Sequence, residues 1–258
     1  MIHIKTEAEI AKMRAAGLVV SAALEAMRAA IAPGVTTADL DAIAERVIRD
    51  AGATSNFKGY RGGAGGQVPY PATICASIND EVVHGVPDRR HVLQDGDIIS
   101  IDCGAIIEGY HGDAAYTAPV GTVSDAATRL MEVTRQSLWS SIDQLHEGNR
   151  LHEVGRAVQL VAEKAGFSVV RNYVGHGIGT AMHEQPSVPN YWPGTPGPKL
   201  KVGNVFAVEP MVNIGSPDTV ELADGWSVVT RDGSLSAHFE HTIAVTEEGP
   251  EVFTRADV

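Results

Sequence analysis

The sequence predicts an α/β fold made of two similar halves, with helices on the outside and a mixed sheet inside. Helical stretches in each half are followed by strand-like segments punctuated by glycine. In addition, GVTTADLDAIAERVIRDAG at 34–52 aligns with GNRLHEVGRAVQLVAEKAG at 148–166, and both phrases begin and end with glycine. We therefore expect one domain, residues 1–258, with halves of approximately 1–120 and 121–258.

Each half is expected to open with a pair of helices. Thr6 and Glu9 have capping-box spacing, and the apolar residues that follow suit a long helix that ends before Pro33. The first copy of the repeated phrase supplies the second helix. In the second half, a helix over roughly 126–146 precedes the second copy.

The stretch SIDCGAIIEGYHGDAAYT predicts a β-hairpin whose turn is the pair Glu108-Gly109. In such a hairpin Gly104 lies opposite Asp113, and Asp102 is the diagonal neighbour of Asp113 on the same face. At about 5 Å and an effective dielectric near 20, two carboxylates repel by about 3 kcal/mol. A positive group is expected between them, which is a metal ion, a shared proton, or an Arg or Lys.

Three further residues are candidates to join this acid pair. His176 stands between two glycines, which indicates a tightly folded backbone, and Glu209 and Glu240 lie in apolar, strand-like runs. Together the four acids and the imidazole would be balanced by two divalent cations. Hard oxygen ligands with one imidazole suit Mn, Fe, Co or Zn, and two such ions support hydrolysis by activating a bridging water.

Composition narrows the class of protein. Apolar residues make up 44% of the 258 residues, which is normal for a soluble globular protein, and no run is long enough to span a membrane. The N-terminal stretch is a charged helix and not a signal peptide, and Cys75 and Cys103 form no disulfide framework. A cytoplasmic protein is expected. The net charge of −12 argues against broad nucleic-acid binding.

Five motifs in order, NDEVVHGVPD, SIDCGAIIEGYHGDAAYT, GHGIGTAMHEQP, FAVEPM and LSAHFEHT, resemble those of bacterial type I methionine aminopeptidases. The resemblance implies a pita-bread fold, in which pseudo-twofold halves surround a curved antiparallel sheet. It implies removal of the initiator methionine from nascent polypeptides, with a small second residue preferred. It also implies two divalent metal ions per chain, drawn from Co, Mn, Fe, Zn or Ni.

The same resemblance implies roles for individual residues. His84 would meet the substrate near its amine and scissile amide, and His183 would hydrogen-bond the peptide and the developing oxyanion. Glu209 would move a proton from the bridging water, while Asp113 and Glu240 would bridge both ions. By this resemblance the metal ligands are Asp102, Asp113, His176, Glu209 and Glu240.

The methionine pocket departs from the family pattern in part. Met182 stands where an aromatic residue often precedes the second histidine, and the glycine-rich segment 59–71 differs from the usual entry to the pocket. Tyr70, Cys75 and Trp226 still match pocket positions, so an apolar slot for a thioether side chain is expected.

Two alternatives are weighed against this function. An X-Pro aminopeptidase or prolidase on the same fold would carry an extra N-terminal domain, which this sequence is expected to lack. A catalytically inactive pita-bread protein that binds partners would have lost metal ligands, whereas all five are kept. For the enzyme we expect a monomer without membrane association or nucleic-acid substrate, and a transient contact with the ribosome is left open.

Overall fold

The structure is a computed structural model that describes residues 2–62 and 68–255, so positions 63–67 of the glycine-rich segment lie outside the described residues. The helices are α1 (Glu7–Arg28), α2 (Thr37–Asp50), α3 (Asp125–Ile142) and α4 (His152–Lys164). The strands of the first half are β1 (Thr54–Ser55), β2 (Ile74–Ile78), β3 (Glu81–Val83), β4 (Ile98–Ile107) and β5 (Tyr110–Pro119). Those of the second half are β6 (Ser168–Val169), β7 (Gly175–Gly177), β8 (Glu184–Val188), β9 (Val205–Val208), β10 (Met211–Asn213), β11 (Thr219–Glu221), β12 (Val228–Thr230), β13 (Ser236–His238), β14 (His241–Thr246) and β15 (Gly249–Val252).

Helix α1 begins as its sequence predicts. The Glu9 amide donates to Oγ1 of Thr6 at 3.3 Å, and the Glu9 carboxylate accepts from the Thr6 amide at 2.7 Å. This reciprocal capping box satisfies two amides that the first helical turn leaves without partners. The helix ends at Arg28, before Pro33, as expected.

The repeated phrase forms corresponding helices in the two halves, α2 and α4. Leu40 on α2 and Val154 on α4 occupy equivalent positions of the phrase, and both are buried. Glycine is needed at the ends of the phrase because the backbone there has a positive φ, which glycine adopts without strain. The residues with this conformation are Gly34 (91°), Gly52 (73°), Gly148 (87°) and Gly166 (86°).

Helix α3 is shorter than its sequence predicts. It ends at Ile142, and the expected residues up to 146 form a tighter turn in which the amides of Gln144 and Leu145 donate to Ser141 and Ile142. Leu145 is fully buried through this turn. Leu145 fits the spacing of apolar residues in a helix, so the sequence predicted a helix that continues past Ile142.

Every strand pair among the described residues is antiparallel, so the expectation of a mixed sheet was wrong. One sheet pairs β5 with one edge of β4, and β1 and β2 with the other edge. The largest sheet has the order β15-β14-β9-β7-β8. Hairpins join β4 to β5 and β14 to β15, and a hairpin makes its two strands antiparallel.

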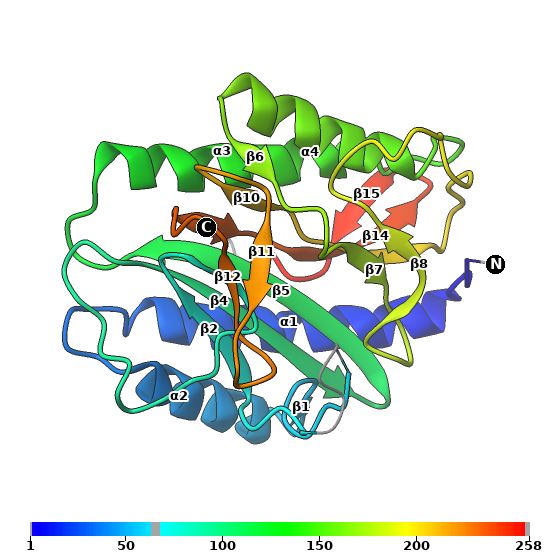
Figure 1. Cartoon of the computed structure of the whole chain (residues 1–258). Coiled ribbons are helices and arrows are strands. Elements are labelled where there is room, and N and C mark those ends of the chain that lie inside the picture. The colour runs from blue at the N-terminus through cyan, green and yellow to red at the C-terminus, as the bar shows by residue number, and fades with distance from the viewer. Residues whose placement is uncertain (1, 63–67, 256–258) are drawn as a thin grey trace.

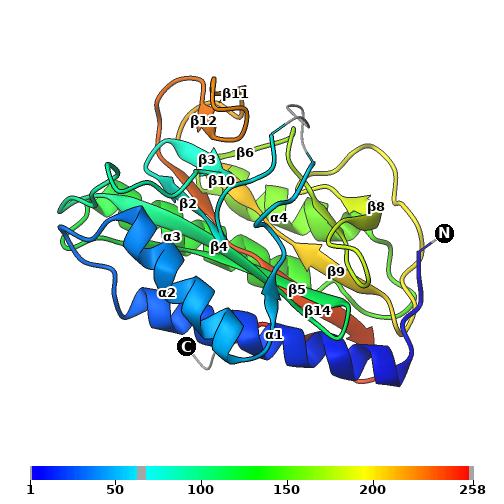
Figure 2. The same ribbon diagram turned by 90° about the horizontal axis from the view of Figure 1, so that it is seen from below.

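The helices and strands divide the molecule into layers. In Figure 1, α1 and α2 lie below the strands, and α3 and α4 lie above them. Figure 2 shows the β11–β12 pair on the side of the strands away from α1. One core cluster joins α1 and α2 to β4 and β5, and another joins α3 and α4 to β10 and β13. Among the described helices, none is long and apolar enough to cross a membrane.

The β4–β5 hairpin has the predicted register. Gly104 is paired with Asp113, and Asp102 is paired with Ala115, so the two acids are diagonal neighbours on one face. The two-residue turn has positive φ at both Glu108 (47°) and Gly109 (79°), which is the backbone of a type I′ turn. Cys103, between these acids, points into the core and is fully buried, as expected for a small apolar filler.

Candidate active site

The predicted ligand residues come from five different segments and meet at one cavity. Asp102 lies on β4, Asp113 on β5 and His176 on β7. Glu209 directly follows β9, and Glu240 lies between β13 and β14, where its backbone bridges to β5. All five line a cavity of about 300 Å³, and none of its described lining residues belongs to a helix.

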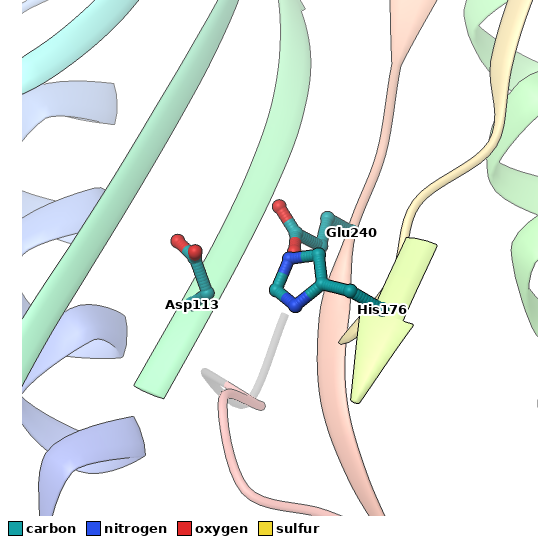
Figure 3. A group of neighbouring side chains, drawn as sticks. All are labelled: Asp113, His176 and Glu240. Carbon is teal, nitrogen blue, oxygen red and sulfur yellow. The ribbon is translucent and has the colours of Figure 1, made fainter. Parts of the chain in front are cut away.

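Three of these residues form a compact group. One side-chain ligand atom from each of Asp113, His176 and Glu240 lies within 4.8 Å of those of the other two. Figure 3 shows Asp113 on one side, facing Glu240 and His176 on the other. Asp102 and Glu209 stand beside this group, and Oε1 of Glu209 lies 3.5 Å from Nε2 of His176.

The imidazole of His176 is oriented by its own backbone. Its Nδ1 lies 2.9 Å from the carbonyl oxygen of Gly177, and a carbonyl can only accept, so Nδ1 carries the proton. Burial lowers the pKa of His176 to about 3, which keeps the ring neutral at neutral pH. The lone pair of Nε2 is consequently available toward the carboxylates, as in a metal-binding histidine.

The ionised form of the four buried carboxyl groups is unfavourable without a compensating positive charge. Burial raises the pKa of Asp102, Glu209 and Glu240 well above their ordinary values, and the neighbouring acids raise it further. Oδ1 of Asp102 and Oδ1 of Asp113 are buried without any hydrogen-bond partner among the described residues. Such oxygens require a compensating group.

A divalent cation fits this donor set. Among the described residues that line the cavity there is no Lys or Arg, so the ammonium or guanidinium alternative is excluded there. A shared proton or a metal cation is left. Partnerless carboxylate oxygens and one neutral imidazole are donors that Mn, Fe, Co and Zn accept.

His84 is held at the cavity by an uncommon backbone conformation. It directly follows β3 with φ of 61°, a left-handed conformation that few residues other than glycine adopt. Its ring packs edge-on against Tyr173 and Trp226, with centroid distances of 5.7 and 6.4 Å. Burial lowers its pKa to about 4, so the ring is neutral at neutral pH.

His183 lies near the mouth of the same cavity. Its ring centroid is 4.3 Å from that of His176, and its Nδ1 lies 2.7 Å from the hydroxyl of Tyr60. The residue is accessible to solvent, although surrounding protein atoms desolvate the ring enough to lower its pKa. The structure therefore brings both histidines suggested by the sequence to the ligand cluster.

An apolar slot adjoins the cluster. It contains the expected pocket residues Tyr70, Cys75 and Trp226 together with Met182 and Phe57, all buried. Tyr70 packs edge-on against Trp226 at 5.1 Å, and its hydroxyl reaches the carbonyl of Ile74 at 2.9 Å. Met182 thus serves as a wall of the slot in place of the aromatic residue that the resemblance suggests.

Two residues at the site were missed by the sequence analysis. Tyr60 contacts His183, and His238 places Nε2 3.8 Å from Oε2 of Glu209. His238 is in the motif LSAHFEHT, two residues before Glu240, so the two-residue period of a strand was a signal that could have located it. Tyr60 had no such signal, because its partner lies 123 residues away.

Comparison with known proteins agrees with this geometry. Residues 11–247 match the model of Metallopeptidase family M24. The chain is 51% identical to methionine aminopeptidase 1 of Bacillus subtilis (strain 168), covering 99% of this chain and 100% of the relative. It is 50% identical to methionine aminopeptidase 1 of Mycobacterium tuberculosis, covering 97% and 94%.

Solved structures of methionine aminopeptidases and of prolidases share this fold but match the chain to different extents. The crystal structure of methionine aminopeptidase from Thermotoga maritima has a TM-score of 0.94 and 44% identity, and the match covers 99% of this chain and 100% of that one. Prolidase from Pyrococcus furiosus has a TM-score of 0.76 and 19% identity, and only 66% of that chain is covered. The likeness to prolidase shows the shared pita-bread fold alone. The chain belongs to metallopeptidase family M24, and within it to the methionine aminopeptidases.

Proposed function

We propose that the chain hydrolyses the first peptide bond of polypeptides that begin with methionine, releasing that methionine, as its relatives' names indicate. The observation that carries this function is the position of the apolar slot beside the buried ligand group. A methionine side chain in the slot brings its own amide to the carboxylates and to His183. The prolidase alternative is not favoured, since those proteins are matched at low identity over part of their length.

We further propose that the five predicted ligands bind two divalent ions. Four carboxylates and a neutral imidazole match the charge of two such ions, and Asp113 and Glu240, both in the compact group, would help to hold them. When bound, the ions would lower the pKa of a water molecule and polarise the scissile carbonyl. Co, Mn, Fe, Zn and Ni all suit these donors. Membership of a metallopeptidase family supports metal use.

The residues of the chain itself have distinct proposed roles. Glu209 accepts a proton from the attacking water and passes it to the leaving amine, since its carboxylate lines the cavity beside His176. His183 donates from its ring to the developing oxyanion. His84, neutral and packed beside Trp226, contacts the substrate near its amine and scissile amide.

The substrate preference follows from the rings around the cavity. Tyr60, His84 and His183 all line it, and they limit the space for the second side chain of the substrate. We therefore propose a preference for a small second residue. The apolar slot admits the unbranched, polarisable thioether of methionine and offers no partner to a charged first residue.

The proposed function is accompanied by proposals on domain organisation, cellular location, ribosome contact and oligomeric state. We propose one catalytic domain, residues 1–258, whose halves 1–120 and 121–258 both supply site residues. Because the substrates are nascent polypeptides, we propose a cytoplasmic location and a transient contact with the ribosome. We expect a monomer, since the proposed site is built from one chain, and sedimentation of the purified protein tests this.

Peptide cleavage tests the function directly. Purified protein is freed of metal, reloaded with each candidate ion, and given Met-Ala-Ser, Leu-Ala-Ser, Met-Trp-Ser and Ala-Pro-Ser, while bound metal is quantified. We expect fast release of methionine from Met-Ala-Ser alone, only in metal-loaded protein. Preferential cleavage of Ala-Pro-Ser would instead assign a proline-directed enzyme. Intact peptides at full metal occupancy would contradict both.

A further inference from the structure

The N-terminal segment carries a partly buried ion pair that the proposed reaction does not use directly. Nζ of Lys5 lies 2.5 Å from Oε2 of Glu184, and the two side chains are 2% and 15% exposed. Nζ also lies 2.8 Å from Nδ1 of His3. Lys and Glu are rarely buried unless paired, so the ammonium has a specific partner in this position.

The same carboxylate closes the turn on which the site residues stand. Oε1 of Glu184 accepts from the amides of Thr180 and Ala181 at 2.9 and 3.4 Å. The two oxygens of one side chain thus join Lys5 on one side and the backbone of the turn on the other. Charged acceptors make stronger hydrogen bonds than neutral ones, so this turn depends on a carboxylate whose charge Lys5 balances.

Lys5 packs directly on the turn and is held in place by its own backbone. A Cβ added to Gly179 would lie 2.5 Å from Nζ of Lys5, so the Lys5 side chain lies directly against the backbone at Gly179. The Lys5 amide donates to the carbonyl of Gly203 at 2.7 Å, just before β9. Figure 1 shows the N-terminal segment near β8, which begins with Glu184.

The turn carries two residues of the proposed site. Met182 is 6% exposed and forms a wall of the apolar slot. His183 follows it, with its ring against His176 and its Nδ1 near the Tyr60 hydroxyl. Glu184 is the next residue in the chain, and its carboxylate accepts from the backbone amides just before both residues.

We propose that Lys5 is a positioning residue, which acts through Glu184 to set the slot wall at Met182 and the ring of His183. The inference rests on the proposed function for its effect on catalysis. Its structural part, that the ion pair holds the turn, is independent of that function. A displacement of about 1 Å at a reacting group can reduce the rate by up to about a hundredfold.

Two substitutions and their combination test the pair. Lys5→Met keeps an unbranched side chain one atom shorter and removes the charge, and Glu184→Gln keeps an acceptor for the turn amides. We expect kcat/KM for Met-Ala-Ser to fall about tenfold to a hundredfold in each, at full metal occupancy. The double variant should be little worse than either single variant, because both break one interaction.

A matched surface pair is the control. Lys12 lies 3.1 Å from Glu108 on exposed side chains of the same part of the chain, so Lys12→Met should leave kcat/KM within about twofold. Selectivity distinguishes positioning from a general loss of stability. A displaced Met182 should lower the ratio of kcat/KM for Met-Ala-Ser to that for Leu-Ala-Ser in Lys5→Met, whereas a smaller folded fraction lowers both equally.

Hydrogen exchange provides a measurement that needs no activity. The amides of Thr180 and Ala181 should exchange at least about tenfold faster in Glu184→Gln and Lys5→Met than in the unsubstituted protein, with Lys12→Met unchanged. Should Lys5→Met not fold, Glu184→Gln decides alone. Unchanged exchange, or unchanged kcat/KM and selectivity in active protein, overturns the inference. Failure of the unsubstituted protein on Met-Ala-Ser overturns the proposed function and leaves the exchange test in force.

Discussion

The hydroxyl of Tyr60 lies 2.7 Å from Nδ1 of His183 at the cavity. Burial raises the pKa of Tyr60, so its hydroxyl is protonated at neutral pH and can donate to Nδ1. A histidine that accepts at Nδ1 carries its proton on Nε2. With the Tyr60 hydroxyl as the donor to Nδ1, His183 would be able to donate from Nε2 to an oxyanion.

Tyr60→Phe should accordingly reduce kcat more than it changes KM. We expect a fall of about two- to tenfold for Met-Ala-Ser, the effect of one neutral hydrogen bond. Steady-state kinetics with the metal-saturated enzyme measure it. Tyr191→Phe is the control, since Tyr191 is not among the described lining residues of the cavity. Equal kcat in Tyr60→Phe and the unsubstituted protein would remove Tyr60 from the site.

Asp113→Asn should separate metal binding from folding. Loss of one carboxylate from the compact group should lower the metal content and abolish cleavage, because the remaining donors no longer balance the cations. Metal should raise the Tm of the unsubstituted protein and leave that of the variant unchanged. Elemental analysis and thermal unfolding measure both, and a variant that keeps its metal would show that Asp113 is not a ligand.

In metal-free protein the same substitution should be increasingly stabilising as the pH rises. Burial raises the pKa of Asp113 above its ordinary value of 3.8. Its protonated form contributes stability below that ordinary value, and this contribution is lost as the pH rises through the raised pKa. Asparagine stays neutral, so the Tm of Asp113→Asn minus that of the unsubstituted protein should grow between about pH 4 and 8 in EDTA. A constant difference would mean that Asp113 has an unshifted pKa.

Tyr70→Phe should weaken the slot without removing its apolar surface. The hydroxyl of Tyr70 lies 2.9 Å from each of the carbonyls of Ile74 and Gly85, and Gly85 directly follows His84. We expect a loss of about 1 kcal/mol in the free energy of unfolding and a higher KM for Met-Ala-Ser. Denaturant unfolding and kinetics measure these. No change in either would show that the hydroxyl does not support the slot.

His84→Asn should lower activity while the fold is kept. Asparagine tolerates the left-handed conformation that His84 adopts with φ of 61°, so the free energy of unfolding should change by less than about 1 kcal/mol. An amide cannot replace the imidazole in its proposed contact with the substrate, and we expect kcat/KM to fall at least about tenfold. Nearly unchanged kinetics would leave His84 with a structural role only.

Local patterns were sufficient for much of the fold. The capping box at Thr6 and Glu9 and the turn at Glu108-Gly109 involve neighbours a few residues apart, and both are confirmed. The diagonal relation of Asp102 and Asp113 followed from strand parity in one hairpin. His176, Glu209 and Glu240 were candidates from their residue types and their local settings. No local rule relates them to a hairpin far away in sequence, so their assignment as a ligand set came from the family resemblance.

Two predictions of the fold were wrong because the structure there depends on contacts between segments far apart in sequence. The helix expected up to residue 146 ends at Ile142, since an apolar residue at the right spacing can be buried equally well by a turn. The mixed sheet was wrong because repeated helices do not specify the direction of the strands between them. The end of helix α3 and the direction of the strands both depend on packing against other parts of the chain.

The sequence by itself determined the start of the first helix, the hairpin with its two acids, and the residue types from which a metal site can be made. Only the tertiary structure decided that Tyr60 meets His183, 123 residues away, and that Lys5 pairs with Glu184, 179 residues away. Periodicity and turn chemistry act over a few residues, whereas these contacts depend on how all the strands pack together. The same packing gathers the charges that a divalent cation is needed to balance.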